Sequence, residues 1–509
     1  MSKLTAITAL DSTLRRARSR QRRSIVNSVL RKDEKFIPNK SHFKNKKINL
    51  KSINFSDLDR IFTEETEVYT RIHNELVGGK VYHSEFQNYF GVNVFILTIL
   101  VISQSDSGMI AKQTFRTSMR SWEGTKKIEE LSIRLMVPDI KSKLEKRGRF
   151  FREIVEEPSY LNYSGSGLTH SWWNWYFWSA TGRVMVDGVG NCIMDPDSIR
   201  NLFSDLYKGR DQEDDENIKF KISDEELFMT WPIVAAFSFR QKKWLGVMVS
   251  NLTKIEFDHE IFEKLVLDQT NKKIIKSLVE HSDKSFTDIV GGKSGGFIFL
   301  LHGPPGTGKT LTAEATAEKL NKPLYVISMG ELGTNIEILE KNLKSILELI
   351  VRWDGVLLLD EADVFLEQRT EKDLERNAMV SVFLRLLEYF NGVLFLTTNR
   401  VKNFDKAFHS RISLAINYPS VNKDVRFKIW QNLLEASGFN SVGNSIYAIV
   451  NINELSKLEI NGRQIKNCIR LAQTLAFSDK IKVTTELLKQ CALLSEKFTN
   501  DLNKSEDYC

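Results

Sequence analysis

The chain has 509 residues, of which 42% are hydrophobic and 27% charged, so it is long enough for two or three ordinary globular domains. Its four cysteines have no paired spacing, which argues against a disulfide framework or a zinc site. The longest largely apolar run, Val94–Ile102, has about half the length that a membrane-spanning helix needs. With no secretory signal visible, we expect an intracellular protein without a membrane span.

The net charge of +7 is concentrated at one end. The first 50 residues hold 14 Lys or Arg and three acids, so they carry +11 and the other 459 residues carry −4. We predict that residues 1–51 form a basic, disordered tail. The run Arg15–Arg23 is compatible with a solvated arm, a nuclear import signal, a nucleic-acid contact or a mitochondrial transit peptide. The expected location is cytoplasmic or nuclear, and a mitochondrial location stays open.

Residues 52–283 read as an α+β N-terminal domain of unknown function. Apolar β-formers predict strands at Val94–Ser103 and Gly182–Val189. Apolar spacing predicts helices at Ile128–Leu135, Ile140–Arg147 and Ile261–His281. Residues 210–217 read as an acidic loop, and no catalytic grouping of side chains is visible in this region.

An aromatic stretch, Ser171–Trp178, stands out within this domain. We favour a buried aromatic core or a sheet edge for it. The alternative is a patch that binds a partner, because exposed aromatic side chains commonly mark interfaces.

A phosphate-binding motif begins after the apolar strand predicted at Phe297–Leu301. It has the pattern G-x-x-x-x-G-K-[ST] and precedes a helix predicted at Leu311–Leu320. Its glycines let backbone N–H groups surround phosphate oxygens, and the helix N-terminus adds positive potential. We expect the following residues to bind ATP, together with Asp360 discussed below: Gly303, Pro304, Pro305, Gly306, Thr307, Gly308, Lys309, Thr310 and Leu311.

Two further predicted strands end in polar residues. Val356–Leu359 runs into Asp360 and Glu361, and Val393–Leu396 runs towards Asn399. Because ligands bind at the carboxyl edge of a parallel sheet, these side chains are expected beside the phosphates. Thr310 and Asp360 are the candidate Mg²⁺ ligands, and Glu361 is the candidate base that polarises the attacking water.

An arginine at position 411 follows a loop after the third strand. In a ring it would reach a neighbour's γ-phosphate and stabilise charge in the transition state, as arginine fingers do. The alternative is a surface or ion-paired arginine. We favour the finger on its position in the chain.

The order of these elements resembles the AAA+ ATPase family over residues 286–480. The resemblance implies a P-loop α/β core at 284–420, a helical lid at 421–500 and a C-terminal tail at 501–509. It also implies that Asn399 is sensor 1, that Arg463 touches the phosphates from the lid, and that Ile289 and Val290 lie against the adenine. A hexameric ring is implied by the resemblance alone.

Several runs resemble a fungal group of AAA-type ATPases that carry a domain of unknown function before the ATPase. These runs are residues 147–149, 182–187, 243–244, 360–369, 376–385 and 387–390. Two departures from the wider family stand out. The stretch Ser328–Ile336 has no aromatic residue where many unfoldases grip a threaded chain, and the Ser410–Arg411 pair is similar to that of DNA clamp loaders.

Three biological roles are compatible with the predicted ATPase. The first is remodelling of a protein partner recognised by residues 52–283. The second is work on nucleic acid, with the basic tail contacting phosphates. The third is an ATP-gated assembly scaffold, which would need none of Glu361, Asn399 and Arg411. We favour the first, since the chain after its tail is slightly acidic and shows no nucleic-acid module.

Overall fold

The computed structural model describes residues 52–494, except residues 73, 90, 172–173, 204–205, 209–219, 281–295, 334, 368–373, 401–404 and 439–449. The predicted basic tail, the acidic loop at 210–217 and the segment at 286–292 therefore lie outside the described residues. The chain divides into two compact units, Met1–Lys254 and Ile255–Cys509. No helix in the described part combines the length and apolarity needed to cross a membrane.

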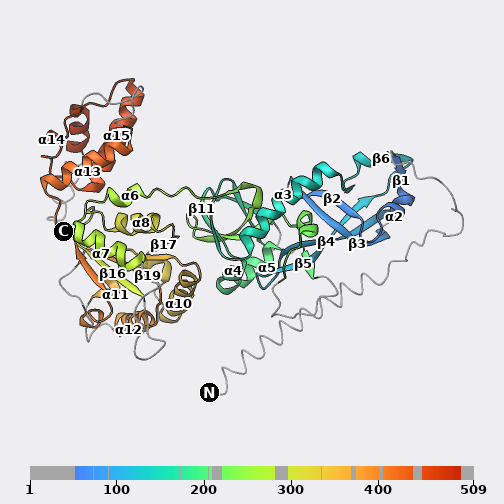
Figure 1. The fold of residues 1–509 in the computed structure, drawn as a ribbon, viewed down its shortest axis with the longest axis horizontal. Coiled ribbons are helices and arrows are strands. Elements are labelled where there is room, and N and C mark those ends of the chain that lie inside the picture. The colour runs from blue at the N-terminus through green and yellow to red at the C-terminus, as the bar shows by residue number, and fades with distance from the viewer. Residues whose placement is uncertain are drawn as a thin grey trace, which may run out of the picture. The chain divides into compact units, whose positions relative to one another are not determined.

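The first unit is built on antiparallel sheets (Figure 1). A six-stranded sheet has the order β12-β5-β4-β3-β2-β7, a seven-stranded sheet has the order β10-β9-β14-β13-β11-β8-β15, and β1 pairs with β6. The strands are β1 (Ser52–Asn54), β2 (Glu67–Ile72), β3 (Glu75–Tyr89), β4 (Val92–Gln104), β5 (Ile110–Arg120), β6 (Thr125–Lys127), β7 (Arg134–Leu135), β8 (Ser159–Tyr163), β9 (Ser166–Ser171), β10 (Asn174–Ser179), β11 (Gly182–Val186), β12 (Leu206–Lys208), β13 (Ile233–Ser238), β14 (Lys243–Met248) and β15 (Leu252–Thr253).

The helices of this unit are α2 (Leu58–Ile61), α3 (Pro138–Val155), α4 (Gly188–Met194) and α5 (Pro196–Leu202). α3 buries Leu144, Phe151 and Ile154 at helical spacing. Gly148 lies on the same face, where an added Cβ would be 2.1 Å from the Leu227 carbonyl oxygen. The close approach of α3 to the segment at residue 227 therefore requires glycine.

Two strand predictions and one helix prediction in this unit are confirmed. Val94–Ser103 lies within β4, Gly182–Val189 forms β11 as far as Val186, and Ile140–Arg147 lies within α3. The helix predicted at Ile128–Leu135 is wrong: the segment is a 3-10 turn followed by β7. Leu131 and Ile133 are both buried, and a spacing of two is the period of an extended chain.

The second unit holds a parallel five-stranded sheet of order β17-β18-β19-β16-β20 (Figure 1). Phe299 and Phe395 stack at 4.7 Å between ring centroids in a core shared with α8. The strands are β16 (Phe297–His302), β17 (Leu324–Ile327), β18 (Val356–Leu359), β19 (Val393–Thr398) and β20 (Leu414–Asn417). The helices are α6 (Glu260–Glu263), α7 (Gln269–Glu280), α8 (Lys309–Lys319), α9 (Met329–Leu332), α10 (Ile336–Arg352), α11 (Asp363–Leu366) and α12 (Leu374–Glu388).

The domain boundary predicted after residue 283 is corrected to Lys254. Phe262 of α6 and Ile275 of α7 belong to the core around the parallel sheet, so this segment packs with the second unit. The single helix predicted at Ile261–His281 is also divided. The Asp268 carboxylate accepts hydrogen bonds from the N–H groups of Thr270 and Asn271 and starts α7 as a new helix.

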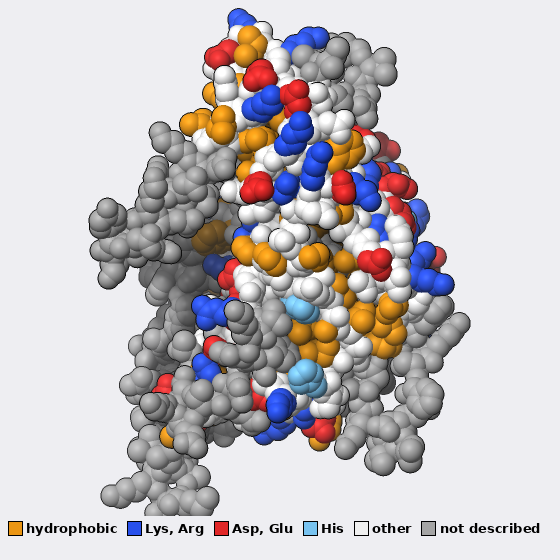
Figure 2. Space-filling model, turned by 90° about the vertical axis from the view of Figure 1, so that its left-hand side faces the viewer, with side chains coloured by type: hydrophobic (Ala, Val, Ile, Leu, Met, Phe, Trp, Pro, Cys, Tyr) orange, Lys and Arg blue, Asp and Glu red, His pale blue; other side chains and the backbone are white. Residues whose placement is uncertain are grey.

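A small helical subdomain follows the sheet, as expected for a lid. Its helices are α13 (Lys423–Ala436), α14 (Ile452–Leu455) and α15 (Gly462–Asp479), and a further helical segment covers residues 485–494. Trp430, Leu434 and Leu488 lie in its own apolar core. Figure 2 shows basic and acidic side chains intermixed over the lid helices at the top of that view, as on a solvated surface.

Candidate nucleotide-binding site

Three neighbouring strands of the parallel sheet end at one edge. His302 at the end of β16 pairs with Thr398 of β19, and Leu359 at the end of β18 pairs with Leu396 of β19. Polar residues follow β18 and β19 directly and the glycine loop follows β16, where the buried apolar runs stop at the sheet edge. The predicted site residues after β16, β18 and β19 are thus brought together.

The loop from Gly303 to Gly308 turns back into α8. Gly303, Gly306 and Gly308 all have positive φ, at 143°, 75° and 101°. A Cβ on Gly303 would be 2.1 Å from the Tyr418 carbonyl oxygen, and Gly308 is the left-handed N-cap of α8. These positions need glycine. In a glycine loop of this kind, backbone N–H groups and the following helix N-terminus can surround an anion.

Lys309 is buried at the centre of this loop, with 7% of its surface exposed. Its Nζ donates to the carbonyl oxygens of Gly303 and Pro304, both at 2.7 Å, and to Oδ1 of Asn399 at 2.9 Å. Burial lowers the pKa of Lys309, the Asp360 carboxylate opposes that shift, and Arg463 adds to it. A buried cation bonded only to neutral oxygens is suited to a polyanion.

Thr310 and Asp360 face each other across the strand ends. Thr310 Oγ1 donates to Asp360 Oδ1 at 3.3 Å. The Thr397 hydroxyl donates to the same carboxylate and accepts the backbone N–H of Glu361 at 2.9 Å. Glu361 itself is exposed and has a left-handed backbone, with φ at 57°. The buried Thr397 hydroxyl therefore links the Asp360 carboxylate to the backbone N–H of Glu361.

Sequence reasoning missed Thr397 as a residue of this site. Its only signal was its place at the carboxyl end of an apolar strand, two residues before Asn399. The register that sets it against Asp360 is a property of the assembled sheet.

The lid contacts the loop directly. The backbone N–H of Gly462 donates to the Gly306 carbonyl at 3.0 Å, and a Cβ on Gly306 would be 2.6 Å from Oδ1 of Asn461. Asn461 caps α15 and so fixes the start of that helix at the loop. Arg463 follows immediately, and its charge acts on Lys309.

Arg411 lies on a short turn after β19 and is bonded within its own unit. Its guanidinium donates to the Ala407 carbonyl at 2.9 Å and to the Glu388 carboxylate at 3.3 Å. These contacts are separate from the cluster around Lys309. Ile289 and Val290 lie outside the described residues.

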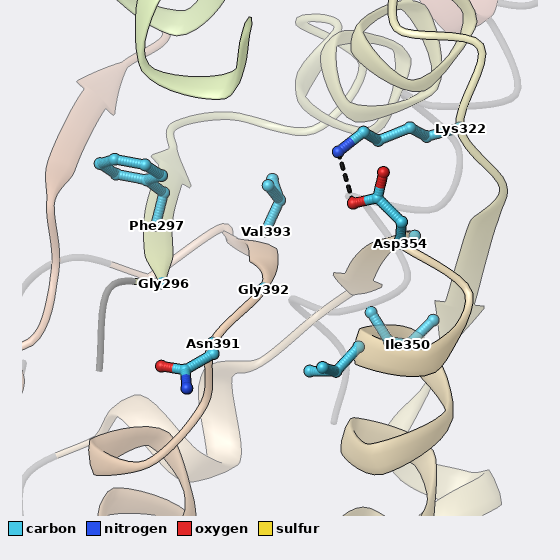
Figure 3. A pocket seen from close by; sticks show the side chains of 10 residues that line it. Gly296, Phe297, Lys322, Ile350, Asp354, Asn391, Gly392 and Val393 are labelled. Atoms are coloured by element: carbon cyan, nitrogen blue, oxygen red, sulfur yellow. Dashed lines mark hydrogen bonds and ion pairs between the residues drawn. The ribbon is translucent and has the colours of Figure 1, made fainter. Parts of the chain in front are cut away.

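The hollow shown in Figure 3 is separate from the candidate nucleotide-binding site. It has a volume of about 80 Å³ and lies where β16 and β19 begin, at the opposite edge of the sheet from the loop. Lys322 and Asp354 form an ion pair of 2.6 Å on its wall. The candidate phosphate ligands do not line it.

Comparison with known proteins agrees with this geometry. A family model described as "ATPase family associated with various cellular activities (AAA)" matches residues 299–420. The chain is 28% identical over 213 residues to ATPase family AAA domain-containing protein FIGL1 of Arabidopsis thaliana, covering 38% of this chain and 31% of that protein. It is 26% identical over 281 residues to a mitochondrial AAA-ATPase of the same plant, covering 48% and 59%.

Two further similarities fall in the same range. Spastin of Sus scrofa is 27% identical over 205 residues, covering 38% of this chain and 32% of that protein. The crystal structure of the FIGL-1 AAA domain is similar with a TM-score of 0.36 at 20% identity, covering 47% of this chain and 85% of that one. The matches span about a third to three fifths of the curated relatives' lengths.

The loop, strand order and lid define a nucleotide-binding domain of the P-loop NTPase fold. Residues 299–420 match the AAA family model, so this part of the chain carries an AAA domain.

Proposed function

We propose that the second unit binds ATP with Mg²⁺ and hydrolyses it. The observation that carries this proposal is the convergence of Lys309, Thr310, Asp360 and Asn399 at the glycine loop. Thr310 and Asp360 supply a hydroxyl and a carboxylate, and Mg²⁺ prefers such oxygen ligands completed by phosphates and water. The bound ion would neutralise charge on the phosphates.

Each side chain has a proposed role in that reaction. Lys309 would exchange its carbonyl partners for the phosphate oxygens, and Ile289 and Val290 would contact the adenine. Glu361 would accept the proton of the attacking water, which Asn399 would orient. Arg463 would reach the phosphates from the lid. Arg411 would act on the site of a neighbouring subunit, which requires a ring, proposed to be hexameric.

We further propose that ATP turnover remodels a protein partner recognised by the N-terminal region, residues 52–283. The similarity to a proteasome-activating nucleotidase of Halobacterium salinarum, 30% identical over 142 residues, supports a protein partner. We also propose that the chain is related to the fungal group of AAA-type ATPases that carry a domain of unknown function before the ATPase. A nucleic-acid substrate is the alternative, and it rests on the charge of residues 1–51 and on the similarity of the Ser410–Arg411 pair to that of DNA clamp loaders.

The test is the ATPase rate per subunit against protein concentration, with sizing in ATP. We expect the wild-type rate to climb with concentration. Lys309→Ala should lose nucleotide binding. Arg411→Ala should bind ATP and turn over about 10³-fold more slowly, as expected for an arginine finger. Mixing the two variants should restore part of the rate at mixed interfaces. A rate that is constant in a monomer and indifferent to Arg411 would refute the shared site.

A further inference from the structure

The seven-stranded sheet of the first unit is free of acidic residues on all of its strands. The strands come from two stretches, residues 158–186 and 227–255, and neither contains Asp or Glu. The same stretches contain five cations, namely Arg183, Arg240, Lys242, Lys243 and Lys254. Arg183 and Lys243 lie on strands, Arg240 and Lys242 lie in the turn between β13 and β14, and Lys254 pairs with Glu153 at 3.0 Å. The strands and this turn therefore favour anionic partners.

One edge of this sheet, at β10, has no further strand paired to it among the described residues. On its other side β10 pairs with β9. It is six residues long and contains neither proline nor a charged residue. The other sheet edges described in this unit, at β1, β6, β7, β12 and β15, are three residues or fewer. Edge strands of sheets are normally short or carry charged residues, which prevents them from pairing with other chains. β10 has neither of these protections.

The end of β10 is aromatic and lies beside a cationic turn. Phe177 is 63% exposed and Trp178 is 43% exposed. Nζ of Lys243 lies 4.8 Å from the centroid of the Trp178 ring. The side chain of Gln241 donates to the Ser179 carbonyl at 2.9 Å, which joins the turn between β13 and β14 to the end of β10.

The turn between β13 and β14, together with the first residue of β14, carries three cations. Arg240, Lys242 and Lys243 are all exposed. α5 packs against β9 and β14 and supplies two acids. Asp195 accepts the Ser198 N–H as its helix cap, and Asp197 pairs with Arg200 at 3.3 Å. Among the described residues, the turn between β13 and β14 therefore presents positive charge at the end of β10.

We propose that β10 is a docking edge for an extended, acidic segment of a partner polypeptide. The segment would add a strand through its backbone, because only another strand satisfies a row of alternating N–H and C=O groups. Its carboxylates would face Arg240, Lys242 and Lys243. A second copy of this chain is disfavoured, because it would bring the same cations to the same edge.

Single-stranded nucleic acid fits less well than a peptide. It offers phosphates for the cations and bases for stacking, but no ladder for the backbone of β10. The Trp178 indole N–H already donates to Thr169 Oγ1 at 3.2 Å, and one face of its ring is under Lys243. That the docked protein is the remodelled partner rests on the proposed function, whereas the docking itself does not.

The test uses the full chain without ATP and a fluorescent octapeptide of alternating Val and Glu, followed by anisotropy. We expect binding that weakens roughly tenfold or more in the double variant Lys242→Glu/Lys243→Glu, because two attractive charges become repulsive. The control variant Arg116→Glu/Arg120→Glu makes the same charge change at exposed positions of β5 and should bind as wild type. Hydrogen exchange of residues 174–179 should slow on binding.

Three matched probes decide the mode of binding. The same peptide with Lys in place of Glu, and the acidic peptide N-methylated at alternate residues, should both fail to bind. Oligo-thymidine should also fail. The proposal is overturned if the acidic peptide does not bind, if it binds the two double variants equally, if N-methylation has no effect, or if oligo-thymidine protects β10 instead. Lys309→Ala should retain peptide binding, which separates this test from that of the ATPase.

Discussion

Replacing Thr397 with valine removes one hydroxyl from the interior of the ATPase unit and leaves the shape of the side chain nearly unchanged. Thr397 is 2% exposed. Its hydroxyl donates to the Asp360 carboxylate and accepts the Glu361 N–H at 2.9 Å. The valine variant therefore removes one hydrogen-bond partner from Asp360 and one from Glu361, and both residues have proposed roles in hydrolysis.

The expected loss of stability follows from these two hydrogen bonds. A hydrogen bond to a charged group contributes about 1.5–3 kcal/mol, and a shielded N–H without an acceptor costs about 1–3 kcal/mol. Because Asp360 keeps Thr310 as a partner, we expect a loss near the lower end, about 3 kcal/mol in the free energy of unfolding. For a unit of this size that lowers Tm by roughly 6–12 °C.

Turnover should fall as well, by about 10- to 100-fold, because small displacements of reacting groups have effects of that size. The assay pairs thermal unfolding with ATPase rate at saturating ATP. Thr397→Ser keeps the hydroxyl and should restore most of both quantities. A valine variant with wild-type Tm and rate would refute the reasoning, and a serine variant as impaired as valine would show that the hydroxyl is not the cause.

Further outcomes are expected. Gly303→Ala should destabilise the unit by at least ~2 kcal/mol in urea unfolding, because φ is 143° and the Cβ would be 2.1 Å from the Tyr418 carbonyl oxygen. Burial raises the pKa of Tyr418 to about 12. The protonated phenol therefore contributes fully to stability below pH 10, and this contribution is lost as the pH rises towards 12. Tyr418→Phe should reduce that alkaline loss of stability, which unfolding measured from pH 9 to 11 would show. Burial, with Cys491 nearby, raises the pKa of Cys468 to about 11, so its thiol should resist iodoacetamide at pH 8 until the protein is unfolded, as mass spectrometry would show. Glu361→Gln should bind ATP but hydrolyse it very slowly, measured by nucleotide retention after gel filtration.

The nucleotide loop was predictable from the sequence because its parts are contiguous. A buried strand, three glycines with positive φ and a lysine at the start of a helix occur between Phe297 and Lys309, and local backbone geometry suffices to form the loop. The strand β4 was predictable for the same reason, since its apolar run is read directly from neighbouring residues.

Other features depend on contacts between distant segments, which periodicity does not report. Thr397 reaches Asp360 only because β18 and β19 pair in register. Arg411 is held by Glu388, 23 positions away, at the end of α12. α7 reads as an ordinary amphipathic helix, and only its packing against the parallel sheet assigns it to the second unit.

The sequence by itself determined the chemistry of the loop, because the order of residues along the chain sets which groups a short turn can gather. The tertiary structure alone decided where the units divide, which hydroxyl supports the two acids, and which strand is left at an open edge. Those outcomes depend on register and burial, which exist only once strands distant in sequence have paired.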